Sequence, residues 1–270
     1  EVPYARAQHY WATGLSVRRG LYNVDSIRYM YFKDRTPAFE AFLSGQIDYW
    51  QESSANAWAT RYNTDSVKSG KIRKEELAHG RVAPMQAFVL NTRREQFKDP
   101  RVRRALNLAF DFEELNKSLF YGMYKRVGSY FDNSELKASG LPQGRELELL
   151  EKFKDRLPPE VFTKEWANPV AKNPGDFRKN LRTAMQLLRE AGWRLDGGRL
   201  VNADGKQFSI EFLIQQDDWK KIVNAYAGAL RKLGIDVRAR LIDSAQAGFH
   251  DAPVEHGVRP FGRPLPGEPK

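Results

Sequence analysis

The chain has 270 residues, of which 41% are hydrophobic and 29% charged, and its formal net charge is +10 at pH 7. This composition predicts a globular protein with a sizeable core. The absence of cysteine excludes disulfides, thiol catalysis and cysteine-based zinc or iron–sulfur sites. The sequence contains no run of about 18 apolar residues, so no membrane span is predicted. The first residues, EVPYARAQHYW, lack a start methionine and the pattern of a signal peptide, and are typical of the interior of a longer chain or of a processed end.

Residues 27–52 predict an α/β unit. Residues 27–32 have the composition of a strand. Thr36 is the expected N-cap of a short helix with Pro37 at its first position, and Gly45 ends that helix. Residues 47–50 are the expected second strand. The order strand, helix, strand is typical of an α/β fold.

The stretch NTRREQFKDPRVRRALNLAFDF, residues 91–112, is rich in arginine and raises the question of nucleic-acid binding. It follows a predicted strand over residues 85–91. Asp99 and Pro100 predict the start of a helix. Its apolar face has regular helical spacing and consists of Val102, Ala105, Leu106, Ala109 and Phe110. The arginines fall mainly outside this face, and Asp111 with Glu114 predicts the cap of a second helix.

Residues 132–175 are rich in proline, glycine and charge. They predict a long surface excursion that contains one helix and is anchored by Phe162 and Trp166.

Residues 176–242 give the clearest pattern in the chain. Asp176 is the expected cap of a helix that Gly192 ends, and two glycine turns follow. A strand over residues 208–214, a helix beginning at Asp217 or Asp218 and a strand over residues 235–243 predict a βαβ unit. Beyond Asp243 the apolar periodicity stops, and residues 247–270 are expected to be extended or disordered.

No motif of the sequence indicates an enzyme. The histidines lack metal-ligand spacing, and the nucleophile elbow, the P-loop and the dinucleotide fingerprint are all missing. Carboxylate pairs such as Glu75–Glu76 are typical of solvated surface. We therefore expect no catalytic residue, no metal and no cofactor.

The segment IDYWQESSANAW, residues 47–58, is the best candidate for a binding site. Tyr49 and Trp50 are followed by hydrogen-bonding side chains in an expected loop. This arrangement suits the wall of a pocket for a small molecule or a peptide. The alternative is that Trp50 and Trp58 pack in the core and that Glu52 faces water.

Four stretches in this order, RTPAFEAFLSGQIDYWQE, the long segment from NTRREQF to GRELELL, LRTAMQLLREAGWRL and YAGALRKLGIDVRARLID, resemble the extracellular solute-binding proteins of family 5. These are the dipeptide- and oligopeptide-binding components of ABC importers. The form of the second stretch resembles the YejA-like subgroup. The resemblance covers residues 1–246.

The resemblance implies an α/β fold of the two-lobed type II periplasmic-binding-protein class, cluster C-like and incomplete. Residues 1–85 would be the C-terminal part of the first lobe with the crossover, and residues 86–246 most of the second lobe, followed by a divergent tail over residues 247–270. A full member has roughly twice this length, so the chain looks like a fragment. The missing part would include an acidic residue that, in peptide-binding members, pairs with the α-amino group of the ligand.

The resemblance also implies a monomeric periplasmic receptor that captures oligopeptides and delivers them to the permease subunits of an ABC-type inner-membrane importer. The receptor would touch the membrane only through the permease and would have neither cofactor nor metal. The matching segments imply a ligand site formed by Trp50, Gln51, Glu52, Ser53, Trp58, Phe88 and Asn91. Glu52 would accept a hydrogen bond from a ligand ammonium.

Two alternatives stand beside the receptor. A basic nucleic-acid-binding module would cluster its lysines and arginines on one face with stacking aromatics, whereas here basic and acidic residues alternate, as in KIRKEELAHGR. We therefore expect no nucleic-acid partner. The other alternative is a truncated remnant of the receptor that binds no ligand.

Overall fold

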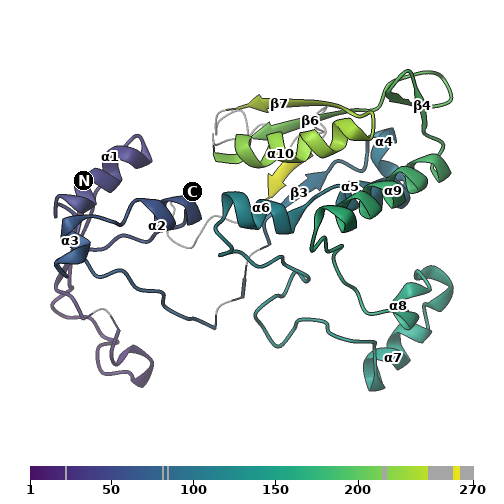
Figure 1. The fold of residues 1–270 in the computed structure, drawn as a ribbon. Coiled ribbons are helices and arrows are strands. Elements are labelled where there is room, and N and C mark those ends of the chain that lie inside the picture. The colour runs from purple at the N-terminus through teal and green to yellow at the C-terminus, as the bar shows by residue number, and fades with distance from the viewer. Residues whose placement is uncertain (22, 81, 84, 215–217, 243–257, 262–270) are drawn as a thin grey trace. The chain divides into compact units, whose positions relative to one another are not determined.

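The computed structural model describes residues 1–270 except 22, 81, 84, 215–217, 243–257 and 262–270 (Figure 1). The chain forms two compact units, residues 1–76 and residues 77–270. Each unit has its own apolar cluster and is described by itself.

The first unit combines a two-stranded ribbon with short helices. Strands β1 (Val2–Ala5) and β2 (Ser26–Tyr29) pair antiparallel. The helical elements are η1 (Ser16–Arg18), α1 (Arg35–Leu43), α2 (Ala55–Thr60) and α3 (Asp65–Lys68). Around Phe39, Phe42 and Tyr62, which are buried, pack Trp50, Trp58 and other half-buried apolar side chains. This aromatic cluster is the core of the unit.

Two predictions for this unit are wrong in detail. Helix α1 begins after Asp34 rather than Thr36, because proline is tolerated throughout the first turn and does not fix the first residue. Residues 47–50 form no strand. Their apolar members, Ile47 and Trp50, pack on the aromatic cluster instead of pairing in a sheet.

The second unit is built on a four-stranded sheet of order β3-β8-β6-β7. The strands are β3 (Ala87–Leu90), β6 (Ser209–Ile214), β7 (Asp236–Leu241) and β8 (Val258–Phe261). Strands β6 and β7 are parallel and α10 (Asp218–Lys232) connects them, which confirms the predicted βαβ unit. Strand β3 confirms the strand expected over residues 85–91.

Strand β8 lies inside the stretch that was expected to be extended or disordered. It pairs antiparallel with β3 along four residues and touches β6 in parallel at a single pair. The sequence hides this strand because Pro260 has no amide hydrogen and proline is rare in central strands. The other residues of 247–270 lie outside the described residues.

The predicted helices after β3 are confirmed. Helix α4 (Glu95–Lys98) precedes α5 (Pro100–Leu108), whose N-cap Asp99 accepts a hydrogen bond from the amide of Arg101 at 2.8 Å. Helix α6 (Phe112–Leu119) is capped by Asp111. Arg101 and Arg104 are exposed, whereas Val102 and Leu106 are buried. The arginine-rich stretch is therefore a solvated helix surface over a packed face.

Helix α9 (Pro174–Glu190) packs beside α5 and starts earlier than predicted. Its N-cap is Asn173, whose side chain accepts hydrogen bonds from the amides of Gly175 and Asp176. Asp176 lies in the first turn, where its carboxylate complements the helix dipole without being the cap. The hairpin of β4 (Arg194–Asp196) and β5 (Arg199–Val201) follows, as predicted.

The excursion before α9 contains α7 (Gly144–Glu151), η2 (Lys154–Arg156) and α8 (Glu160–Thr163). Its expected aromatic anchor is wrong for Trp166, which is 66% exposed. Arg126 takes that part: its guanidinium donates to the carbonyl of Pro169 and to Oδ1 of Asn107, both at 2.6 Å. The sequence did not predict this role, because hydrogen bonds from an arginine leave no apolar pattern in the sequence.

Gly234 provides a test of how the hairpin joins the βαβ unit. It ends α10 with φ +80°, and a Cβ atom there would lie 2.7 Å from the backbone nitrogen of Leu200. Gly192 has φ +88° but open space around it. We expect Gly192→Ala to cost about 1–2 kcal/mol from backbone strain, and Gly234→Ala to cost at least about 1 kcal/mol more from the clash. Urea unfolding of both variants measures the difference, and equal losses would contradict the packing described.

Candidate ligand-binding site

The segment Trp50–Trp58 follows the irregular stretch after α1 and runs into α2. Ser54 ends the irregular part, because its hydroxyl accepts a hydrogen bond from the amide of Ala57 and caps α2. Ala55 and Ala57 of this short helix are both buried. A capped helix on one side and the aromatic cluster on the other fix the path of the loop between them.

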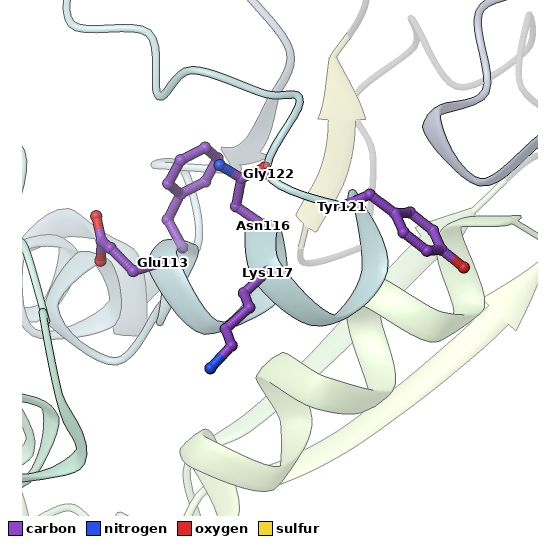
Figure 2. Close-up of a pocket in the computed structure, with 6 residues that line it drawn as sticks. Glu113, Asn116, Lys117, Tyr121 and Gly122 are labelled. Atoms are coloured by element: carbon purple, nitrogen blue, oxygen red, sulfur yellow. The ribbon is translucent and has the colours of Figure 1, made fainter. Parts of the chain in front are cut away.

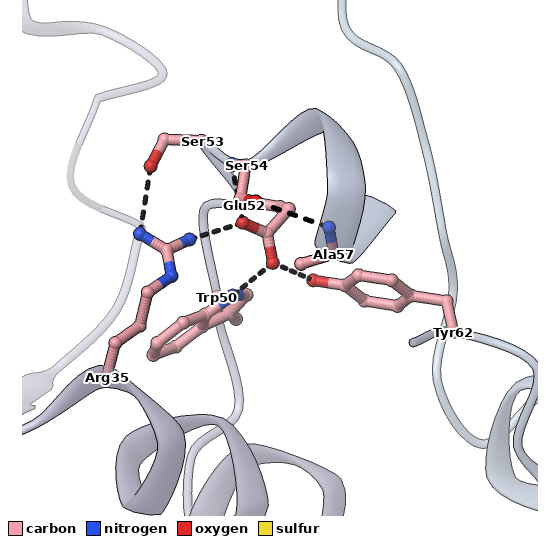
Figure 3. Close-up of polar contacts among 7 residues, drawn as sticks. All are labelled: Arg35, Trp50, Glu52, Ser53, Ser54, Ala57 and Tyr62. Atoms are coloured by element: carbon pink, nitrogen blue, oxygen red, sulfur yellow. Dashed lines mark hydrogen bonds and ion pairs between the residues drawn. The ribbon is translucent and has the colours of Figure 1, made fainter. Parts of the chain in front are cut away.

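Glu52 lies at the centre of the loop, and its side chain is only 3% exposed. Its carboxylate accepts hydrogen bonds from the amide of Ser54 at 2.7 Å, the hydroxyl of Tyr62 at 3.0 Å and the indole of Trp50 at 3.3 Å. The guanidinium of Arg35 forms an ion pair with the same carboxylate (Figure 3). A buried carboxylate is stable when paired and hydrogen-bonded in this way.

These contacts set the charge of Glu52. Burial by itself raises the pKa of its carboxyl group, but the amide of Ser54, the charge of Arg35 and the bonds from Trp50 and Tyr62 together hold the pKa below its usual value. Burial and the neighbouring carboxylate raise the pKa of Tyr62, which therefore stays protonated and donates. The network thus keeps an anionic Glu52 at neutral pH.

Some of the predicted loop residues face the interior of the unit, and others are exposed. Glu52 faces inward, so the alternative that it faces water is wrong, and its four donors favour an internal role over contact with a ligand ammonium. Trp50 and Trp58 pack on the aromatic cluster, as the other part of that alternative expected. Gln51 and Ser53 are exposed, as is Tyr49 at 74%.

Arg35 is the member that sequence reasoning missed. Its Nη1 donates to the hydroxyl of Ser53 at 2.9 Å, and its guanidinium lies over the ring of Trp50. It therefore ties an outward-facing side chain to the buried carboxylate. Arg35 is 17 residues before Glu52 in the chain, and no local pattern links the two.

Phe88 and Asn91, the other two predicted site residues, belong to the second unit. The ring of Phe88 is partly buried and packs against Phe212, Tyr226 and Trp219 at the core of that unit. Asn91 is half-buried, and its side-chain oxygen accepts from the amide of Arg93 at 3.1 Å. A contact between Phe88 and a ligand therefore has no support in the packing of this unit.

A separate hollow lies along α6, with a volume of about 440 Å³ (Figure 2). Its lining consists of Phe112, Glu113, Asn116, Lys117, Tyr121 and Gly122. Both polar ends of the Asn116 amide bind the backbone of Tyr124, and Glu113 accepts from the amide of Ala171. These groups hold the surrounding loops, and no predicted site residue lines the hollow. Among the described residues, no acidic or histidine cluster is arranged to hold a metal ion.

Comparison with known proteins identifies the class. The model of the bacterial extracellular solute-binding proteins, family 5, middle part, matches residues 1–256. The chain belongs to this family, and the predicted resemblance is confirmed. Structures of the same class confirm the type II periplasmic-binding-protein fold as an incomplete domain. In the part of the chain that the structure describes, no helix combines the length and apolar character needed to cross a bilayer.

Two curated relatives define the YejA-like position within the family. The probable peptide-binding protein YejA of Agrobacterium fabrum is 47% identical over 248 residues, which are 91% of this chain and 40% of that protein. The peptidoglycan-binding protein YepA of the same organism is 34% identical over 251 residues, 90% of this chain and 41% of that protein. The chain thus spans about two fifths of the length of these relatives and corresponds to a fragment of them.

Two solved structures show how broad the fold class is. The oligopeptide-binding protein AppA of Bacillus subtilis, in complex with a nonapeptide, is similar with a TM-score of 0.58 and 19% identity over 91% of this chain and 42% of that chain. NikZ of Campylobacter jejuni, in complex with Ni(L-His), gives 0.59 and 16% over 90% and 41%. Since such similarity shows the fold alone, it leaves the solute open.

Glu52→Gln tests the internal role of the carboxylate. The amide cannot accept from four donors and loses the ion pair, so we expect a loss of about 2–4 kcal/mol in the unfolding free energy of the first unit. The control is Glu40→Gln, because Glu40 pairs with Arg61 at a surface where its side chain is 60% exposed. That variant should lose less than about 1 kcal/mol. Equal losses in urea unfolding would remove the proposed role of Glu52.

The lowered pKa of Glu52 predicts a pH dependence. A folded-state pKa below the unfolded value contributes stability that is present above the unfolded value, about 4.3, and is lost as pH falls through the folded pKa. The difference in unfolding free energy between wild type and Glu52→Gln should therefore be constant from about pH 5 to 7 and should shrink below about pH 4. A difference that grows on acidification would contradict this sign.

Proposed function

We propose that this chain is the ligand-contacting middle part of a periplasmic peptide receptor, which delivers its ligand to the permease subunits of an ABC-type importer. Family membership supports the receptor class, since the members are transport receptors rather than enzymes. The name of the 47% identical relative, probable peptide-binding protein, supports the peptide as solute. As in the sequence-based expectation, the receptor acts as a monomer, with residues 1–85 in the first lobe and residues 86–246 in the second.

The observation that carries the proposal is the loop around Glu52. Its inward side is fixed by four donors, while the side chains of Tyr49, Gln51 and Ser53 face outward. A rigid loop that presents an aromatic ring, an amide and a hydroxyl suits the hydrogen bonds and apolar contacts that a peptide offers. Pre-organisation lowers the entropic cost of binding.

Local charge pairing favours the receptor over a nucleic-acid-binding module. Several basic side chains of the described part pair with acids close by, among them Arg61 with Glu40, Lys98 with Glu95 and Arg145 with Glu148. Such pairs neutralise the charge that a phosphate backbone would use. The net charge of +10 is therefore compatible with an extracellular receptor.

Peptidoglycan fragments are a second candidate for the solute. The support is the name of the 34% identical relative, peptidoglycan-binding protein YepA. Stem peptides of peptidoglycan share the peptide backbone with nutrient oligopeptides, so the same loop suits both.

Thermal melting of this chain with tripeptides, longer oligopeptides and soluble peptidoglycan fragments tests the function. A ligand that binds only the folded state raises the midpoint by mass action. We expect a saturable rise for one of the three classes and a smaller rise for Gln51→Ala. The control Gln46→Ala removes another exposed glutamine and should leave the rise unchanged. The absence of any rise with all three classes would overturn the proposal.

A further inference from the structure

A lysine of the chain itself occupies an aromatic pair next to the Glu52 network. The Nζ atom of Lys74 lies 4.3 Å from the ring centroid of Trp58 and 5.2 Å from that of Tyr62. It also donates to the carbonyl of Trp58 at 2.6 Å. Both distances to the rings fall within the range of a cation–π interaction, for which tryptophan is the strongest partner.

The two rings pack in the aromatic cluster and are also held by hydrogen bonds that do not involve the lysine ammonium. The hydroxyl of Tyr62 donates to Glu52 at 3.0 Å, and the indole of Trp58 donates to Glu76 at 3.2 Å. The ring centroids are 5.4 Å apart with an angle of 57° between the planes. Tyr62 is buried and Trp58 half-buried. The aromatic pair is therefore a formed site for a cation.

The lysine, in contrast, is an exposed residue on a segment without secondary structure. Its ammonium group makes one hydrogen bond to a carbonyl and two contacts to rings. A primary ammonium group of another molecule can form each of these interactions equally well. Exchange of one ammonium for another conserves both the charge and the number of contacts in the site.

We infer that Trp58 and Tyr62 form a subsite for a primary ammonium group of the ligand, and that Lys74 occupies this subsite until the ligand displaces it. The ligand group is the amino terminus of a peptide or the side chain of a lysine. The inference deepens the proposed function and rests on it. It replaces Glu52 as the ammonium-binding group, since Glu52 acts on this subsite only by holding Tyr62.

A tethered competitor has a measurable effect. A group on a short flexible segment acts at an effective concentration on the order of millimolar, so Lys74 should weaken the binding of a free ammonium ion. Lys74→Met removes the charge and keeps a linear apolar side chain. We expect this variant to bind n-butylammonium at least about threefold more tightly than wild type.

Tryptophan fluorescence of this chain, titrated with n-butylammonium chloride at constant ionic strength, measures the effect. n-Butanol is the neutral control and should give no saturable response. Lys71→Met is the matched control, because Lys71 is an exposed lysine three residues away, and it should behave as wild type. Trp58→Leu, checked for folding by circular dichroism, should lose the response.

Equal or weaker n-butylammonium binding by Lys74→Met would overturn the inference and leave Lys74 as a structural contact. The same response to n-butanol would also overturn it, because the site would then be apolar rather than cation-binding. A peptide-induced rise in melting midpoint together with no ammonium response would retain the receptor and remove only this subsite. Ammonium binding without any peptide effect would remove the receptor function and retain the subsite.

Discussion

In the first unit, the buried carboxylate of Glu52 requires several hydrogen-bond donors, and these donors determine how the surrounding segments are arranged. A carboxylate with a 3% exposed side chain is unstable unless donors replace the water that it loses. The donors come from the loop itself, from the start of α1 and from Tyr62, two residues after the end of α2. Glu52 therefore links segments that also share the aromatic cluster, and the outward side chains of the loop take their positions from this link.

The second unit depends on apolar packing in a larger core. Phe88, Phe212 and Tyr226 bring β3, β6 and α10 together, and the buried hydroxyl of Tyr226 donates to the carbonyl of Leu106 at 2.7 Å. This bond joins α10 to α5 within the core. Phe88 lies on the face of the sheet that packs against α10, and its ring contributes to this packing. The positions of Phe88, Phe212 and Tyr226 are explained by the stability of this core.

The parts of the fold that follow from local rules were predictable from the sequence. The βαβ unit, the caps at Asp99 and Asp111 and the hairpin have regular periodicity or turn residues, and all are confirmed. The strand β8 and the missing strand at residues 47–50 were not predictable, since they depend on pairing across long distances in the chain. For the candidate site, the sequence predicted an irregular loop but not the direction of its side chains. The inward turn of Glu52 depends on Arg35 and Tyr62, which no spacing rule connects with it.

Arg35 and Lys74 are two cations beside this loop with different roles, and the sequence alone does not distinguish these roles. Arg35 neutralises a buried carboxylate, so removing it leaves an unpaired charge inside the protein. Lys74 lies on aromatic faces that carry no net charge, so removing it leaves neutral rings that another cation can cover. A cation is structural when its removal leaves a buried, unpaired charge. It is exchangeable when its removal leaves neutral groups that another cation can cover. By this criterion Arg35 belongs to the framework of the loop and Lys74 to its binding surface.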